Sequence, residues 1–117
     1  MSDAPAGSDG AARITELRAA VDRLDQRIVE LLAVRTRVVR ELTAHKSDEA
    51  AVRSPDRVRQ VLDRVAELAG RHGMPPEVAV ATYRTLIEEL TRMQQEMLAD
   101  RRAAGAAPAA PAAPERR

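Results

Sequence analysis

Apolar residues recur every three and four positions along the first third of the chain, the spacing of one buried stripe on a helix. No Gly or Pro interrupts residues 11–46, so we expect one continuous helix roughly 50 Å long. One heptad position, between Leu31 and Val38, holds Arg35. A guanidinium in a helix core is costly, so Arg35 either pairs with a protein carboxylate, contacts a ligand or extends to water. The apolar stripe consists of Ile14, Leu17, Val21, Leu24, Ile28, Leu31, Val38 and Leu42.

Two shorter helices are expected after this one. The segment 54–56 reads Ser-Pro-Asp, which suits the N-cap, the first helical position and the first turn of a helix. Glycines within residues 70–73 end this second helix. A third helix begins at residues 75–77 and runs to about Asp100. The pattern therefore predicts a three-helix chain with a long, a short and a medium helix.

Segments at both ends differ in composition from the helical part. Residues 1–10 are small and polar, and residues 101–117 are a low-complexity Ala/Pro stretch. We expect both to be disordered, which leaves residues 11–100 as a single helical domain.

Composition favours an all-α fold. The chain has no Cys, Trp or Phe, and Tyr83 is its one aromatic residue, so the core is built from aliphatic side chains, Ala and Met. The net charge of +1 and the absence of a basic stripe argue against binding nucleic acid. No segment is apolar enough for a membrane span, and no signal peptide is visible, so a cytoplasmic location is expected.

The length of the first helix predicts an oligomer. About 85 ordered residues do not make a compact domain that covers a 50 Å helix. A second copy would bury the remaining stripe, so we expect a two-fold homodimer. The alternative from a different class is a non-catalytic helical module that only dimerises.

Several polar residues fit a common anionic ligand. Lys46 lies eleven residues after Arg35, on the same side of the helix. Arg18 lies seventeen residues before Arg35, roughly 25 Å away within one chain, so only the partner's Arg18 would reach Arg35 in an antiparallel dimer. Arg57 lies in the first turn of the second helix, where free N–H groups favour an anion. Gln94 is an amide among apolar residues. Each also has a simpler interpretation as a solvated side chain.

Together these residues resemble the all-helical (AroQ-type) chorismate mutase family. The resemblance covers about residues 13–98, and its motifs are L-R-x-x-[VI]-D-x-L-D, the Arg eleven residues before Lys, SPDRV and LIEELTRMQQEML. It implies an intertwined homodimer of three-helix subunits with two active sites. It also implies an isomerase that performs a [3,3] rearrangement of a dicarboxylate, the chorismate enolpyruvyl ether, with no metal or cofactor.

The resemblance also implies roles for individual residues. Arg18 from the partner subunit and Arg35 would bind the substrate carboxylates, with Arg57 on the same anionic side. Lys46 and Gln94 would donate hydrogen bonds to the ether oxygen of the breaking bond. Some short family members are activated by a partner enzyme, which remains an open alternative for this chain.

Three positions depart from the family pattern. Ordinary members have an acid at Ser54 and a glutamate at Val58, which contact the ring C4 hydroxyl, and commonly a serine at Leu90. We therefore favour 4-amino-4-deoxychorismate as the substrate. Ordinary chorismate mutase activity, with these residues as a helix cap and packing, is one alternative. Isochorismate pyruvate lyase activity is another, since the segment KSDEAAVRSPDRV looks like the loop of those lyases, whereas RMQQEM looks more like mutases.

Overall fold

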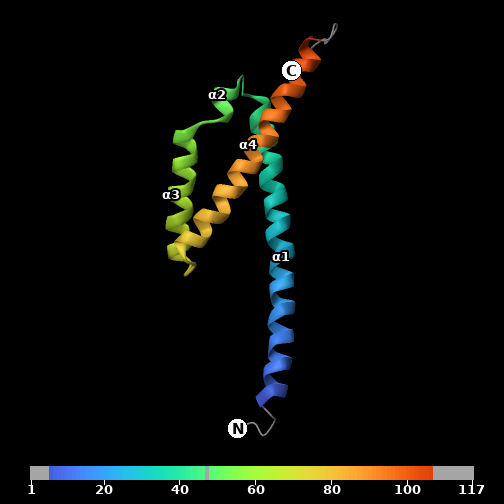
Figure 1. The fold of residues 1–117 in the computed structure, drawn as a ribbon, viewed down its shortest axis with the longest axis vertical. Helices are drawn as coiled ribbons and strands as arrows, with labels where there is room; N and C mark the ends of the chain where they lie inside the picture. Colours follow the sequence, from blue (N-terminus) through green and yellow to red (C-terminus); the bar gives the residue numbers. More distant parts are fainter. Residues whose placement is uncertain (1–5, 47, 107–117) are drawn as a thin grey trace. The chain divides into compact units, whose positions relative to one another are not determined.

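The computed structural model describes residues 6–46 and 48–106, and this part of the chain is all-α, as the composition predicted (Figure 1). The chain divides into two units, the first ending at Val38 and the second beginning at Val39. The first unit is most of α1, and the second holds the end of α1 with the other helices. The helices are α1 (Ala6–Ala44), α2 (Glu49–Val52), α3 (Pro55–Arg71) and α4 (Pro76–Ala106).

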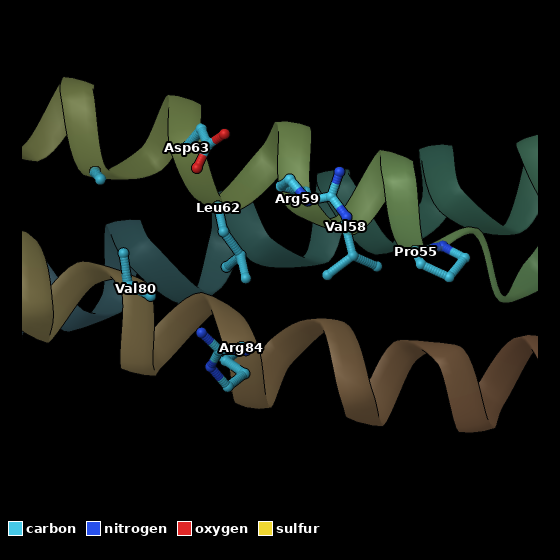
Figure 2. Close-up of a pocket in the computed structure, with 8 residues that line it drawn as sticks. Pro55, Val58, Arg59, Leu62, Asp63, Val80 and Arg84 are labelled. Carbon is cyan, nitrogen blue, oxygen red and sulfur yellow. The ribbon is translucent and has the colours of Figure 1, made fainter.

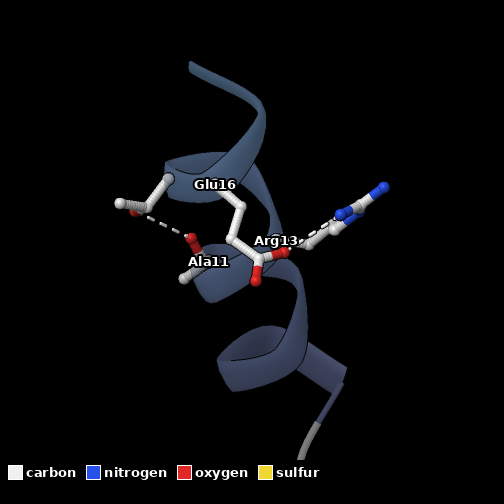
Figure 3. A network of polar contacts seen from close by, with 4 residues as sticks. Ala11, Arg13 and Glu16 are labelled. Carbon is white, nitrogen blue, oxygen red and sulfur yellow. Dashed lines mark hydrogen bonds and ion pairs between the residues drawn. The ribbon is translucent and has the colours of Figure 1, made fainter. Parts of the chain in front are cut away.

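The beginning of α1 is held by local contacts. Arg13 Nη1 lies 3.0 Å from Glu16 Oε1, and Thr15 Oγ1 donates to Ala11 O at 3.1 Å (Figure 3). These groups are exposed, and an exposed ion pair between residues three apart adds only a few tenths of a kcal/mol. The helix propensity of the Ala-, Leu- and Arg-rich sequence therefore matters more for this segment than its surface charges.

The apolar stripe predicted from the heptad pattern lies on one face of α1 and is open in the single chain. Leu24 is 60% exposed and Leu31 is 62% exposed, and the other members are also exposed. Arg35 is half-buried. An exposed apolar stripe of this length is typical of a surface that another molecule covers.

In the second unit, α3 and α4 form a hairpin and pack against each other (Figure 1). The turn between them is a Schellman motif, in which Met74 N donates to Ala69 O at 2.8 Å and Gly73 N donates to Gly70 O at 3.3 Å. Gly73 has φ 74°, a conformation that only glycine adopts easily. The predicted end of the second helix at residues 70–73 is confirmed.

The short helix α2 was not predicted. Asp48 begins it, because Asp48 Oδ1 accepts a hydrogen bond from Ala51 N at 3.0 Å. Val52, at its other end, is buried, and α2 contacts α4. One buried apolar anchor and one cap are therefore enough to fold a segment that the sequence pattern placed in a loop. The remaining buried apolar residues of the described chain are Ala69, Ala79 and Leu98.

The helix ends differ from the sequence prediction. The first helix begins at Ala6, and α4 continues to Ala106, so residues 6–10 and 101–106 are helical where disorder was expected. The Ala and Arg residues of 101–106 favour helix even without an apolar face. Residues 6–10 read Ala-Gly-Ser-Asp-Gly, and their helical propensity does not explain why α1 begins there. Residues 1–5 and 107–117, also expected to be disordered, lie outside the described residues. Within the described helices, none is long and apolar enough to cross a membrane.

Candidate active site

The polar centre of the second unit is the side-chain amide of Gln94, on α4. Gln94 is 7% exposed, and its Oε1 accepts hydrogen bonds from Thr43 Oγ1 at 2.8 Å and from Lys46 Nζ at 2.9 Å. Thr43, in the last turn of α1, is 1% exposed. A buried amide oxygen needs such partners, because an unsatisfied one costs about 1–3 kcal/mol. The two donors leave the amide nitrogen of Gln94 available for another acceptor.

Lys46 is the titratable group that this environment perturbs. Desolvation of its ammonium, with the nearby Arg57 guanidinium as the second cause, lowers the pKa of Lys46 below its usual 10.5. Both causes disfavour a cation at this place. An anionic ligand bound nearby would offset the repulsion between Lys46 and Arg57 and so favour the charged form of Lys46. The structure therefore brings Lys46 and Gln94 into contact, with the Arg57 guanidinium near enough to affect the pKa of Lys46, and the roles of these residues toward a substrate stay a prediction.

Arg57 is positioned by the beginning of α3. Ser54 is the N-cap, and its Oγ accepts a hydrogen bond from Arg57 N at 3.3 Å. The predicted helix start at Ser54 and Pro55 is confirmed. Arg57 itself is exposed, and its Nη1 lies 3.4 Å from Gln60 Oε1. An exposed guanidinium with one long hydrogen bond is free to reorient toward an anion.

Two apolar positions singled out from the sequence have different surroundings. Val58 points from α3 toward α4 into an open cavity of about 380 Å³ (Figure 2). Leu90 is half-buried on α4, one turn before Gln94. Position 58 therefore faces an α3–α4 space whose described lining has one carboxylate, that of Asp63. The residues lining this cavity are Pro55, Val58, Arg59, Leu62, Asp63, Ala66, Val80 and Arg84.

Arg18 and Arg35 both lie on α1 within the first unit. Seventeen residues of helix separate them by roughly 25 Å, so one chain does not bring them to a common small ligand. Arg18 is exposed and Arg35 is half-buried. Whether Arg18 acts across a subunit interface stays a prediction.

Two residues of this site were missed by the sequence argument. Thr43 does not lie on the apolar stripe, and its one signal in the sequence was its position three residues before Lys46. Arg101 was assigned to a disordered tail, but its Nη1 donates to Ala44 O at 3.1 Å and its Nη2 donates to Lys46 O. No sequence pattern links Arg101 to the end of α1.

Taken together, these groups define a class of site on an all-α fold. A buried amide, a desolvated ammonium and a guanidinium offer hydrogen-bond donors and positive charge, and the centre of the site contains no carboxylate among its described residues. Such a set binds an anion and stabilises negative charge that develops on an oxygen atom.

Comparison with known proteins agrees with that class. The family model for chorismate mutase type II matches residues 17–95, so the chain belongs to this family and is an isomerase. A chorismate mutase of Methanocaldococcus jannaschii is 22% identical over 89 residues, which cover 75% of this chain and 90% of that protein. The family predicted from the sequence motifs is confirmed. The interpretation as a non-catalytic module is set aside.

Proposed function

We propose that the chain converts a chorismate-like enolpyruvyl ether into the prephenate-like product by a [3,3] rearrangement. The observation that carries this proposal is the Lys46–Gln94 pair, in which a half-buried ammonium donates to a buried amide. In this reaction the C–O bond of the ether breaks as a C–C bond forms, and negative charge develops on the ether oxygen. No proton or electron has to be exchanged with the protein.

The geometry of the pair supports a donor role for both side chains. Lys46 Nζ uses one N–H for Gln94 Oε1 and keeps two for a ligand. Gln94 Oε1 is occupied by Thr43 and Lys46, so the amide nitrogen is the atom left for the ether oxygen. Donors fixed before the reaction stabilise the transition state without reorganisation, and losing one such donor typically lowers kcat by about 10²–10³-fold.

The substrate is a flexible dianion, and its carboxylates need cations. We assign Arg57 and Arg35 to these carboxylates, with Arg18 supplied by a second copy of the chain. Holding the dianion in a compact reactive shape lowers the entropic part of the barrier. The exposed apolar stripe on α1 supports a homodimer, because burying it in a partner removes a large apolar surface from water.

Mixing inactive subunits tests the donation of Arg18. Arg18→Ala and Arg35→Ala chains should each be inactive alone. If Arg18 acts across the interface, a mixed dimer keeps one intact site, so an equal random mixture should recover about a quarter of wild-type activity. No recovery in a mixture shown by mass spectrometry to contain mixed dimers would contradict the assignment.

The ring substituent that this chain accepts is a separate question. Positions 54 and 58 present no carboxylate, and we propose 4-amino-4-deoxychorismate as a second candidate substrate on that ground. Ser54 Oγ accepts from Arg57 N but still has a hydrogen to donate and a lone pair to accept, so it suits a hydroxyl or a neutral amine.

A competition assay separates these substrates. The protein would be given chorismate, 4-amino-4-deoxychorismate and isochorismate together, with the products identified by mass. A prephenate product supports the ordinary mutase, and the amino analogue of prephenate supports the second candidate. Salicylate with pyruvate would contradict both in favour of a lyase.

Restoring the two acids provides a matched test of specificity. Because Asp is as good an N-cap as Ser, Ser54→Asp adds a carboxylate without removing the helix cap. If 54 and 58 determine the substrate, Ser54→Asp with Val58→Glu should raise kcat/KM for chorismate relative to the amino analogue. An unchanged ratio would contradict a role for these positions in specificity.

A further inference from the structure

Backbone carbonyl groups at the end of α1 accept hydrogen bonds from a side chain of α4. The last turn of α1 has no basic residue of its own to meet the negative end of the helix dipole. His45 N donates to Leu42 O and Lys46 N donates to Thr43 O, both at 3.0 Å, which tightens the final turn. The carbonyls of Ala44 and Lys46 need donors from elsewhere.

Arg101 of α4 supplies both of these donors. Its Nη1 donates to Ala44 O at 3.1 Å, and its Nη2 donates to Lys46 O. Two bonds from the two amino groups of one planar guanidinium fix direction as well as distance, which a single ammonium does not do. The positive charge of Arg101 also lies where the dipole of α1 is negative.

Lys46 is thereby held by α4 at two separate points. Lys46 lies two residues beyond the end of α1, so the helix ladder does not hold its carbonyl. Gln94 binds its Nζ, and Arg101 binds its carbonyl. Gln94 and Arg101 are seven residues apart, two turns along one face of α4, with the buried Leu98 between them.

We propose that Arg101 is a positioning residue that clamps the end of α1 onto α4 and so places the Lys46 ammonium beside Gln94. The proposal rests on the function proposed above, in which Lys46 contacts the ether oxygen. The family match ends at residue 95, so Arg101 lies outside the part of the chain that the family defines.

Kinetics of three variants test the clamp. Misplacing a donor by about 1 Å can cost up to 10²-fold in rate, so we expect Arg101→Ala to lower kcat about tenfold with a much smaller change in KM. Arg101→Lys should recover part of this loss, because an ammonium keeps the charge and one bond. Arg102→Ala, the neighbouring exposed arginine, serves as the matched control and should stay within about twofold of wild type.

Amide hydrogen exchange gives a readout that needs no substrate. Arg101→Ala should speed exchange at the amides of His45 and Lys46 about tenfold, because the last turn of α1 opens more often. Exchange in α3 should stay unchanged. Arg102→Ala should leave both regions as in wild type.

The outcomes separate the two proposals. Unchanged kcat and unchanged exchange in Arg101→Ala would overturn the clamp. A lower melting temperature with normal kcat below it would reduce Arg101 to a purely structural role and overturn the positioning claim. A wild-type chain that turns over none of the three substrates would overturn the proposed function, while faster exchange at Lys46 in Arg101→Ala would still support the clamp.

Discussion

At the scale of single residues, the hydroxyl of Thr43 has two acceptors and one hydrogen. Val39 O lies 2.7 Å from Thr43 Oγ1, and Gln94 Oε1 lies 2.8 Å from it. One hydrogen serves one strong bond at a time, so Gln94 depends on Lys46 as its second donor. The same lysine fixes the orientation of the amide, because the opposite orientation would set its NH₂ group against an ammonium.

The first prediction compares two threonines of α1. Thr36 Oγ1 donates to Leu32 O at 2.8 Å, the same bond to the preceding turn that Thr43 makes, and it has no bond to an amide side chain among the described residues. We expect Thr43→Val to lower the free energy of unfolding by about 1 kcal/mol more than Thr36→Val. Chemical denaturation measures both, and equal losses would mean that the Thr43–Gln94 contact does not stabilise the fold.

A second prediction concerns the pH dependence of stability. The pKa of Lys46 is lower in the folded chain than its usual 10.5, so between these two values the unfolded chain holds more protons. The contribution of Lys46 to the free energy of unfolding therefore rises as the pH rises through this window. The side chains that affect the Lys46 ammonium are the neutral amide of Gln94 and the cationic guanidinium of Arg57.

Lys46→Met is the control for that measurement, because it removes the titrating ammonium and keeps an unbranched side chain of similar length. The unfolding free energy of wild type minus that of Lys46→Met should increase from pH 7 toward pH 10.5. A difference that stays flat or falls would contradict the perturbed lysine.

At the scale of the helices, the start of α3 has both a structural and a functional side. Ser54 Oγ caps the helix by accepting from Arg57 N, and Pro55 follows in the first turn. The cap therefore sets the position of the Arg57 backbone, and Arg57 in turn affects Lys46. The hydroxyl of Ser54 therefore helps to set both the start of α3 and the backbone position of Arg57.

A third prediction follows for this cap. Ser54→Ala should lower the free energy of unfolding by about 1 kcal/mol, because the N–H of Arg57 loses its partner. Ser54→Asp should stay within about 0.5 kcal/mol of wild type, because Asp is an equally good cap. Thermal unfolding of the two variants side by side measures this, and similar losses in both would show that the hydroxyl does not cap α3.

Helix positions were largely predictable from the sequence, and the internal contacts of the site were not. The Ser54–Pro55 start and the glycines at 70–73 are local signals, because caps and turns depend on adjacent residues. Helical spacing placed Arg35 and Lys46 on one side of the helix predicted over residues 11–46 but said nothing about Thr43, and α1 ends at Ala44, before Lys46. The contact of Arg101 with Lys46 spans 55 residues, and no local rule predicts a contact of that range.

At the scale of the whole molecule, each chain leaves its main apolar stripe uncovered. The buried apolar residues of the described chain are few, namely Val52, Ala69, Ala79 and Leu98. Such a small core supplies little of the burial that stabilises a domain of this size. A dimer that covers the stripe on α1 would supply the rest.

A fourth prediction tests this with paired substitutions on α1. Leu24→Gln with Ile28→Gln places two amides on the stripe, and Arg23→Gln with Arg27→Gln places them one residue earlier, off the stripe. The first pair should shift the mass in light scattering from twice 12.8 kDa toward 12.8 kDa and lower the melting temperature by several degrees. The second pair should remain dimeric, and identical behaviour of both pairs would contradict the stripe as the interface.

The wide sequence separation within the site has a consequence during protein synthesis. Thr43 and Gln94 are 51 residues apart, and at 5–20 residues per second a ribosome adds the second roughly 3 to 10 seconds after the first. During that interval neither the hydroxyl of Thr43 nor the ammonium of Lys46 has the amide of Gln94 as its partner. A chain that ends before Gln94 would therefore lack the amide that Thr43 and Lys46 bind, and we expect such a fragment to be inactive.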